Sequence, residues 1–217
     1  MDMEFRDLVA RCGIISICRR LYGQALYLLS DVLAEADILL MEVTFDQEDP
    51  RGREKTAEAI AALHRRHPEM RIGAGTVLTC EEARLVREAG GSFIVSPNTD
   101  SEVIGCAKTL GLAAVPGAMT PSEVAAAAKA GADVVKLFPA DHLGPAYVRE
   151  LRAPLGHIPL LATGGITAQN LADFLAAGCI GAGIGGALCD KALLAAGDRR
   201  GLLERARALR SIVAQYR

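Results

Sequence analysis

A repeated local pattern most limits the folds that this sequence can adopt. A helical stretch ends in a small residue and glycine, a short apolar run follows, and a turn rich in Gly, Pro, Ser or Thr closes the unit. A glycine directly after a helix takes the left-handed conformation at little steric cost. The capping glycines are Gly90, Gly111, Gly131 and Gly178. The long gap before Gly178 leaves room for one more unit, at 157–167.

The N-terminal half follows the same scheme more loosely. Its short apolar runs are typical of parallel strands covered by helices. Thr120 followed by Pro121 is a typical helix start. In this half we predict strands at 13–19, 37–45 and 71–77. Over the whole chain we predict helices at 22–35, 53–67, 80–89, 100–110, 121–130, 168–177 and 190–215.

Together these units give eight predicted strands that alternate with helices. With 217 residues, each unit has about 27 residues, which is compact but sufficient for a (β/α)8 barrel. The alternative is a doubly wound open sheet, which usually has fewer strands, and no dinucleotide fingerprint opens this chain. No linker or low-complexity segment divides the sequence. We therefore predict an α/β fold in which residues 1–217 form a single-domain TIM barrel.

Composition limits the classes of partner that this chain can be expected to bind. The net charge is −2, Trp is absent and aromatic residues make up 4%, so we expect neither a nucleic-acid nor a membrane partner. No apolar run approaches the roughly 18 residues of a membrane span, and the charged N-terminus lacks a signal-peptide core, which predicts a cytoplasmic protein. Six scattered cysteines without a C-x-x-C pair are expected to be small, reduced core residues, with a zinc site or disulfides as the alternative. The four histidines do not cluster, so no metal site is predicted.

The stretch "GADVVKLFPA" (131–140) contains a lysine in the middle of an apolar strand. Lys136 and Glu42 are the two charges inside otherwise apolar strands, whereas the other lysines (55, 108, 129 and 191) lie in helical, solvated contexts. The second and sixth strands of an eight-stranded barrel lie opposite each other and contribute to the same interior layers. The two side chains are therefore expected to face one cavity. They could form a structural buried salt bridge, but we favour a functional pair.

The chemistry of a desolvated amine supports that preference. An ordinary lysine, with a pKa of about 10.4, is protonated at neutral pH and cannot attack a carbonyl group. Burial among Val134, Leu137 and Phe138 is expected to lower this pKa. The free amine could then form a Schiff base with a keto acid, and Glu42 could move the protons.

Two glycine pairs follow the last two predicted strands, in "TGGI" and "GIGGAL". Backbone N–H groups in such turns can converge on an anion, and barrels often bind phosphate at these two strand ends. Tight-turn geometry alone also explains a glycine pair. Two pairs at the two appropriate ends favour phosphate binding.

Six segments, "MEVTF", "GAGTVLT", "IVSPNTD", "VPGAMTPSE", "VVKLFPA" and "ATGGIT", occur in this order over nearly the whole chain. Together they resemble the class I aldolase family that includes 2-keto-3-deoxy-6-phosphogluconate aldolase and 4-hydroxy-2-oxoglutarate aldolase. The resemblance implies a (β/α)8 barrel, usually a homotrimer. It also implies cleavage of a 4-hydroxy-2-oxo acid to pyruvate and an aldehyde, either glyceraldehyde 3-phosphate or glyoxylate. The implied chemistry needs no metal or other cofactor, only a covalent imine with the keto acid substrate.

The resemblance also implies roles for individual residues. Lys136 matches the Schiff-base lysine, Glu42 the general acid/base and Thr76 the residue beside the pyruvate carboxylate. Arg19 aligns with a basic residue at the end of the first strand. The pocket-wall positions are Pro97, Pro116 and Phe138, and the phosphate-binding positions are Gly164, Gly165, Gly186 and Ala187.

Two positions depart from the family pattern. Asp46 stands where many members have an arginine that contacts the substrate carboxylate, and a carboxylate cannot replace a guanidinium there. We hypothesise that Arg19 or Arg20 takes over this contact. Ala187 stands where many members have a serine that helps to hold phosphate, which makes the unphosphorylated substrate 4-hydroxy-2-oxoglutarate a stronger candidate.

Two other functions remain open from the sequence alone. The same barrel could be a phosphosugar isomerase or synthase that uses Glu42 as a base and Lys136 for electrostatics only. It could also be a non-catalytic module that binds sugar-acid phosphates. Asp141 and His142, which follow "KLFPA", are further candidates for substrate contact.

Overall fold

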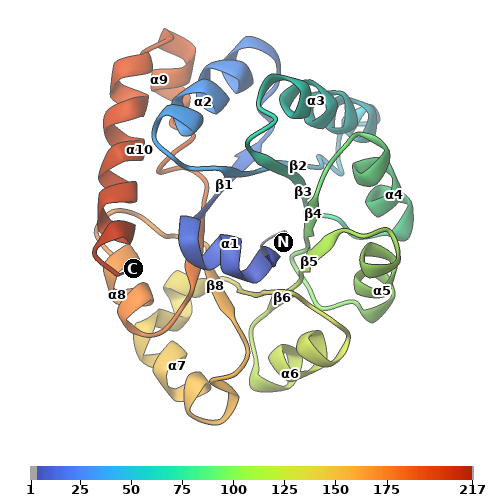
Figure 1. The fold of residues 1–217 in the computed structure, drawn as a ribbon, viewed down its shortest axis with the longest axis vertical. Helices are drawn as coiled ribbons and strands as arrows, with labels where there is room; N and C mark the ends of the chain where they lie inside the picture. Colours follow the sequence, from blue (N-terminus) through green and yellow to red (C-terminus); the bar gives the residue numbers. More distant parts are fainter. Residues whose placement is uncertain (1–3, 217) are drawn as a thin grey trace.

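The computed structural model describes residues 4–216. Within them, nine strands form one sheet in the order β5-β4-β3-β2-β1-β9-β8-β7-β6, and every recorded pair is parallel. The strands form a ring in Figure 1. They are β1 (Ile14–Arg19), β2 (Leu40–Thr44), β3 (Arg71–Gly75), β4 (Phe93–Val95), β5 (Ala113–Val115), β6 (Gly117–Ala118), β7 (Val135–Leu137), β8 (Leu160–Thr163) and β9 (Gly181–Ile184).

The predicted barrel is confirmed, but its fifth strand is split. Pro116 lies between β5 and β6, and proline has no N–H with which to continue a strand ladder. β5 pairs with β4 and β6 pairs with β7, so the chain itself joins the two edges of the sheet. The nine segments therefore correspond to the eight expected barrel strands.

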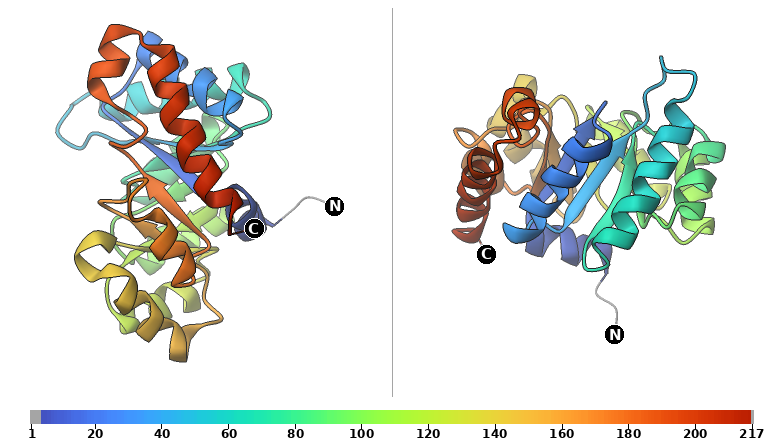
Figure 2. Two further views of the ribbon diagram at one scale, coloured as in Figure 1. Left: turned by 90° about the vertical axis from the view of Figure 1, so that its left-hand side faces the viewer. Right: turned by 90° about the horizontal axis from the view of Figure 1, so that it is seen from above.

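Helices surround the strands (Figure 2). One buried cluster fills the layer between helices and strands, and a second fills the interior of the barrel. The helices are α1 (Phe5–Cys12), α2 (Gly23–Glu35), α3 (Gly52–Arg66), α4 (Cys80–Glu88), α5 (Ser101–Thr109), α6 (Pro121–Lys129), α7 (Ala140–Leu155), α8 (Leu171–Ala176), α9 (Lys191–Ala196) and α10 (Arg199–Ala214).

The helix α1, which we did not predict, lies across the N-terminal end of the barrel (Figure 1). Its Val9 and Cys12 belong to the interior cluster, together with Ile15 and Leu161 from the strands. The ring of Phe5 lies 5.1 Å from that of Phe93, between centroids. Burial of these apolar side chains closes this end of the barrel, which leaves the opposite end open for a site.

Local signals at the helix ends behave as the sequence predicts. Gly90, Gly111, Gly131 and Gly178 all have positive φ. Thr120 and Glu123 form a reciprocal capping box at the start of α6. The predicted helix at 190–215 is wrong as a single element, because Gly197 takes the left-handed conformation and ends α9, after which Asp198 caps α10.

The expectation that all the cysteines are reduced is also wrong. Cys80, at the start of α4, and Cys106, in α5, form a disulfide with a Cα–Cα distance of 5.6 Å. The two residues are 26 positions apart, and only the packing of α4 beside α5 brings them together. Cys12, Cys18, Cys179 and Cys189 are free.

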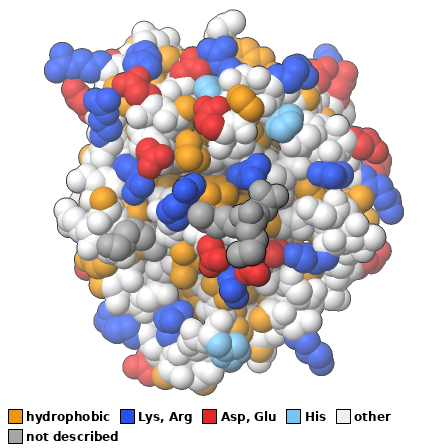
Figure 3. Space-filling model, viewed as in Figure 1, with side chains coloured by type: hydrophobic (Ala, Val, Ile, Leu, Met, Phe, Trp, Pro, Cys, Tyr) orange, Lys and Arg blue, Asp and Glu red, His pale blue; other side chains and the backbone are white. Residues whose placement is uncertain are grey.

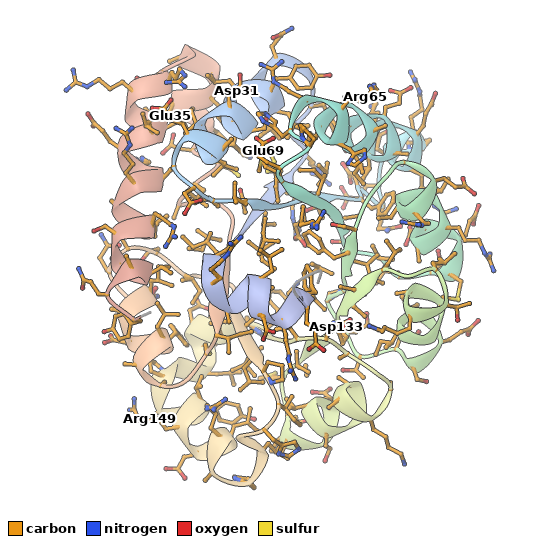
Figure 4. All side chains as sticks on the ribbon, viewed as in Figure 1. Asp31, Glu35, Arg65, Glu69, Asp133 and Arg149 are labelled. Atoms are coloured by element: carbon orange, nitrogen blue, oxygen red, sulfur yellow. A yellow bond between two sulfur atoms is a disulfide. The ribbon has the colours of Figure 1, made fainter. Side chains whose placement is uncertain are left out.

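Ion pairs connect helices on the surface of the barrel. Glu35 of α2, labelled in Figure 4, pairs with Arg207 of α10 at 3.0 Å and also with Arg199. Asp31 of α2 pairs with Arg66 of α3 at 2.6 Å. Acidic and basic side chains are interspersed on the face shown in Figure 3. No helix within residues 4–216 combines the length and the apolar character needed to cross a membrane.

Candidate active site

A cavity of about 570 Å³ opens at the C-terminal ends of the strands, where barrel enzymes carry their sites. Its lining includes residues at or beyond the ends of β1, β3, β7, β8 and β9. The charged side chains that line it are Arg19, Glu42, Lys136 and Lys191. Three cationic groups and one carboxylate make this cavity suited to an anionic ligand.

Glu42 and Lys136 both line this cavity from opposite sides of the barrel. Glu42 is in β2 and Lys136 in β7, and β1, β9 and β8 separate these strands along one side of the ring. Their side chains are deeply buried, with exposed fractions of 2% for Glu42 and 8% for Lys136. The structure therefore brings together the two strand charges that the sequence singled out.

Burial shifts the pKa of each group in the direction that favours its neutral form. Desolvation raises the pKa of Glu42 to about 7, although the positive charges of Lys136 and Arg19 oppose the shift. Desolvation likewise lowers the pKa of Lys136, against the attraction of Glu42 and with help from the repulsion of Arg19. A carboxyl group and an amine that both titrate nearer to neutrality suit proton transfer and nucleophilic attack.

Glycine on the neighbouring strand makes room for the Glu42 carboxylate. A Cβ atom at Gly75 would lie 2.5 Å from Oε1 of Glu42, much closer than atoms can pack. Oε2 of Glu42 is buried and has no hydrogen-bond partner within residues 4–216. A buried polar atom without a partner is rare in proteins, and this one belongs to a side chain that lines an open cavity.

An aromatic ring lies beside the amine of Lys136. Its Nζ lies 4.8 Å from the ring centroid of Phe138, which also lines the cavity. The backbone N–H of Lys136 donates to the carbonyl of Pro116 at 2.9 Å. The split strand thus fixes the backbone of β7 at the lysine.

Arg19 and Arg20 differ in what holds them. Arg20 pairs with Asp46 at 2.8 Å and with Glu48 at 2.5 Å. Arg19 lines the cavity and has no ion pair or side-chain hydrogen bond among the described residues. Arg19 and Arg20 are the two candidates to replace the carboxylate-binding arginine that Asp46 displaces. Of the two, only Arg19 lines the cavity without an ion-pair partner in the described residues.

Thr76 follows β3 and lines the cavity with a φ of 57°, a conformation that β-branched residues rarely adopt. Gln47 holds this turn, because its amide donates to the carbonyl of Thr76 at 3.2 Å and to Glu82 at 2.9 Å. The buried Glu82 also accepts the N–H of Leu78 at 2.7 Å. This network fixes the position of Thr76 against the cavity.

The predicted phosphate-binding residues also line the cavity: Gly164, Gly165, Gly186 and Ala187. Gly164 and Gly165 have φ values of 97° and 68°, which favour glycine. The backbone N–H groups of Gly165, Gly186 and Ala187 have no acceptor within residues 4–216. Unpaired N–H groups in two adjacent turns form a concave surface able to bind an anion.

Several expected residues lie elsewhere. Pro97 and Pro116 are not among the residues that line the cavity, and neither are Asp141 and His142. Asp141 packs against the bare Cα of Gly165, where a Cβ would lie 2.1 Å from its Oδ2.

Sequence reasoning missed Thr163, Cys189 and Lys191, which line the cavity. Thr163 has a buried hydroxyl without a partner in the described part of the chain. It lies two residues beyond Leu161, which faces the barrel interior, so alternation along the strand could have identified it.

No group of three or more potential metal-binding His, Cys, Asp or Glu side chains exists within residues 4–216.

Comparisons with known proteins agree on one family. The family model "KDPG and KHG aldolase" matches residues 8–204. A probable 2-dehydro-3-deoxy-6-phosphogalactonate aldolase of Rhizobium meliloti is 37% identical over 188 residues, which is 86% of each chain. A 2-dehydro-3-deoxy-phosphogluconate aldolase of Treponema pallidum is 37% identical over 149 residues, which is 68% of each chain.

A solved structure described as native KDPGal superposes on this fold with a TM-score of 0.83 at 30% identity. The match covers 94% of this chain and 95% of the other. Fold, cavity and sequence similarity therefore lead to the same conclusion: the chain belongs to the KDPG and KHG aldolase family of class I aldolases.

Proposed function

We propose that Lys136 is the Schiff-base nucleophile and Glu42 the proton carrier of a reaction that cleaves a 2-keto-3-deoxy-6-phospho sugar acid. The observation that carries this proposal is the burial of both groups on opposite walls of one cavity. Desolvation favours the neutral amine that can attack a carbonyl carbon, and it favours a carboxyl group that can both accept and return a proton.

The steps follow from these two groups. The amine of Lys136 attacks C2 of the keto acid, and loss of water gives a protonated imine. The Glu42 carboxylate takes the proton of the C4 hydroxyl, the C3–C4 bond breaks, and its electrons move into the imine to form an enamine. The aldehyde leaves, Glu42 returns its proton to C3, and hydrolysis of the imine releases pyruvate and restores Lys136. The iminium nitrogen is the electron sink in this sequence, so no metal or cofactor is needed.

The two ends of the substrate have separate partners in this proposal. Arg19, as the free guanidinium, and Thr76 bind the carboxylate next to C2, and Phe138 forms a wall beside the imine. Gly164, Gly165, Gly186 and Ala187 bind the terminal phosphate through backbone N–H groups.

The relatives suggest which sugar acids to test. One is named for the galactonate acid and another for the gluconate acid, and these differ in configuration at C4. Because both relatives are named for phosphorylated acids, we propose that this chain cleaves one or both, giving pyruvate and glyceraldehyde 3-phosphate. We propose that 4-hydroxy-2-oxoglutarate, which Ala187 favours in the sequence, is the poorer substrate. We also propose a cytoplasmic homotrimer, as the family resemblance implies; light scattering of the purified protein tests the trimer.

Pyruvate release measured with lactate dehydrogenase tests the proposed function. The wild type should release pyruvate from a phosphorylated acid, Lys136→Met should release none above background, and Glu42→Gln should be strongly impaired. Release by the Lys136→Met variant at the wild-type rate would overturn the assignment of the nucleophile.

A further inference from the structure

Lys191 is an exposed residue that lines the active-site cavity and takes no part in the steps proposed for Lys136 and Glu42. It is the first residue of α9, directly after the turn that contains Gly186 and Ala187. It lines the same cavity as Lys136 and as the glycines proposed to bind phosphate. Although it is exposed, its location at the cavity distinguishes it from the other surface lysines.

Lys191 has no ion-pair partner among the described residues, although Asp190 precedes it in the chain and Asp141 lies beside Gly165, which lines the same cavity. Asp190 accepts the backbone N–H groups of Ala192 and Leu193 at 2.9 and 3.0 Å, and it pairs with Arg205 at 3.1 Å. Asp141 packs against Gly165 and accepts the N–H of His142 at 2.9 Å. Both carboxylates already have partners, so the Lys191 ammonium is left available to a ligand.

The end of the cavity that is proposed to bind phosphate has few charged donors of its own, so a cation there would strengthen binding. Position 187 is alanine, so its side chain supplies no hydroxyl donor, and the unpaired N–H groups of Gly165, Gly186 and Ala187 in the two glycine turns are neutral. The Asp141 carboxylate beside Gly165 also opposes a bound anion. A charged donor strengthens binding of a phosphate more than a neutral donor does.

We propose that Lys191 binds the terminal phosphate of the substrate and makes this aldolase selective for phosphorylated keto acids. The inference rests on the proposed function and deepens it, because it assigns the charge at the phosphate end to a side chain. It also accounts for Ala187: the ammonium of Lys191 replaces the hydroxyl that is missing there.

The test compares Lys191→Met and Lys191→Arg with a control, Lys129→Met. Lys129 is an exposed lysine at the end of α6 that also lacks an ion pair in the described part of the chain, but it does not line the cavity. Each variant is assayed with a phosphorylated 2-keto-3-deoxy sugar acid and with the same acid without its phosphate.

A hydrogen bond to a charged group contributes about 1.5–3 kcal/mol, so Lys191→Met should lower kcat/KM for the phosphorylated acid about 10- to 100-fold. The dephosphorylated acid should be affected less than about twofold, because its cleavage does not use this contact. Lys191→Arg should recover most of the loss, and Lys129→Met should behave as the wild type. Equal loss with both acids, or no loss with either, would overturn the inference.

Inorganic phosphate tests the same contact without turnover. In calorimetric titrations, phosphate should bind the wild type and Lys129→Met but bind Lys191→Met at least about tenfold more weakly. Phosphate that binds all three equally, or that binds none, would overturn the inference. Failure of the proposed function is distinguishable, because it would appear as absence of a pyruvate adduct on Lys136 in the wild type, whatever the phosphate titration shows.

Discussion

The carboxylate of Glu42 occupies the space that a side chain at Gly75 would fill. A Cβ atom at position 75 would lie 2.5 Å from Oε1 and 2.7 Å from Cδ of Glu42. Glu42 is in β2 and Gly75 is the last residue of the adjacent β3, where it pairs with Thr44. The proposed proton carrier therefore owes its position to a missing side chain on the next strand.

Gly75→Ala should displace the Glu42 carboxylate while leaving Lys136 in place. A positioned acid/base group contributes roughly 10²- to 10⁴-fold to rate, so we expect kcat to fall at least about 10²-fold. Trapping of pyruvate on Lys136 should remain. Gly105→Ala is the control, because a Cβ there meets nothing within 4 Å. A Gly75→Ala variant with wild-type kcat would show that the position of Glu42 is unimportant.

The activity should depend on pH through Glu42. The carboxylate is the form that accepts the C4 hydroxyl proton, and burial raises its pKa to about 7, so kcat/KM should fall as the pH drops through that value. Protonation of Lys136 acts in the same direction, because the ammonium cannot attack. The measurement is kcat/KM from pH 5 to 9 in a series of buffers that do not bind to the site. The profile of Glu42→Gln should lack the inflection near 7, and an identical inflection in that variant would assign it to another group.

Arg19→Ala and Arg20→Ala form a matched pair. Within residues 4–216, Arg19 is an unpaired guanidinium at the cavity, whereas Arg20 pairs with Asp46 and Glu48. Loss of a charged contact to the substrate carboxylate should raise KM for the keto acid about 10-fold or more in Arg19→Ala. Arg20→Ala should leave KM within about twofold, since exposed ion pairs contribute little. The reverse pattern would transfer the carboxylate contact to Arg20.

The Cys80–Cys106 disulfide predicts a thiol count. Protein purified without reductant and then denatured should show four reactive thiols, and six after reduction. Cys106→Ser should lower the free energy of unfolding of the oxidised protein by about 3 kcal/mol, because the crosslink restrains the unfolded chain. Six thiols before reduction would show that the pair is reduced in solution.

The parts of the fold that local sequence determines were predictable. Helix-ending glycines such as Gly131 and Gly178, and the cap at Thr120, depend on a few neighbouring residues. The location of Glu42 and Lys136 on opposite walls of one cavity was also predictable, because the barrel fixes where the second and sixth strands lie. The break in the fifth strand follows from Pro116, because proline has no N–H with which to continue a strand ladder.

Features that depend on tertiary packing could not be predicted in the same way. The Cys80–Cys106 pair results from the contact of α4 with α5, and no spacing rule gives that contact. Lys191 looked like an ordinary solvated helix lysine, because its location at the cavity depends on the turn between β9 and α9. The helix α7 was missed since Gly144, with non-helical angles, and two prolines interrupt its pattern.

Reductive trapping tests the central claim most directly. Wild-type protein is treated with borohydride in the presence and absence of pyruvate, and its peptides are analysed by mass spectrometry. The account predicts one reduced pyruvyl group, on the peptide that contains Lys136, which requires pyruvate and is lost in Lys136→Met. An adduct on a different lysine, or no adduct in the wild type, would contradict it.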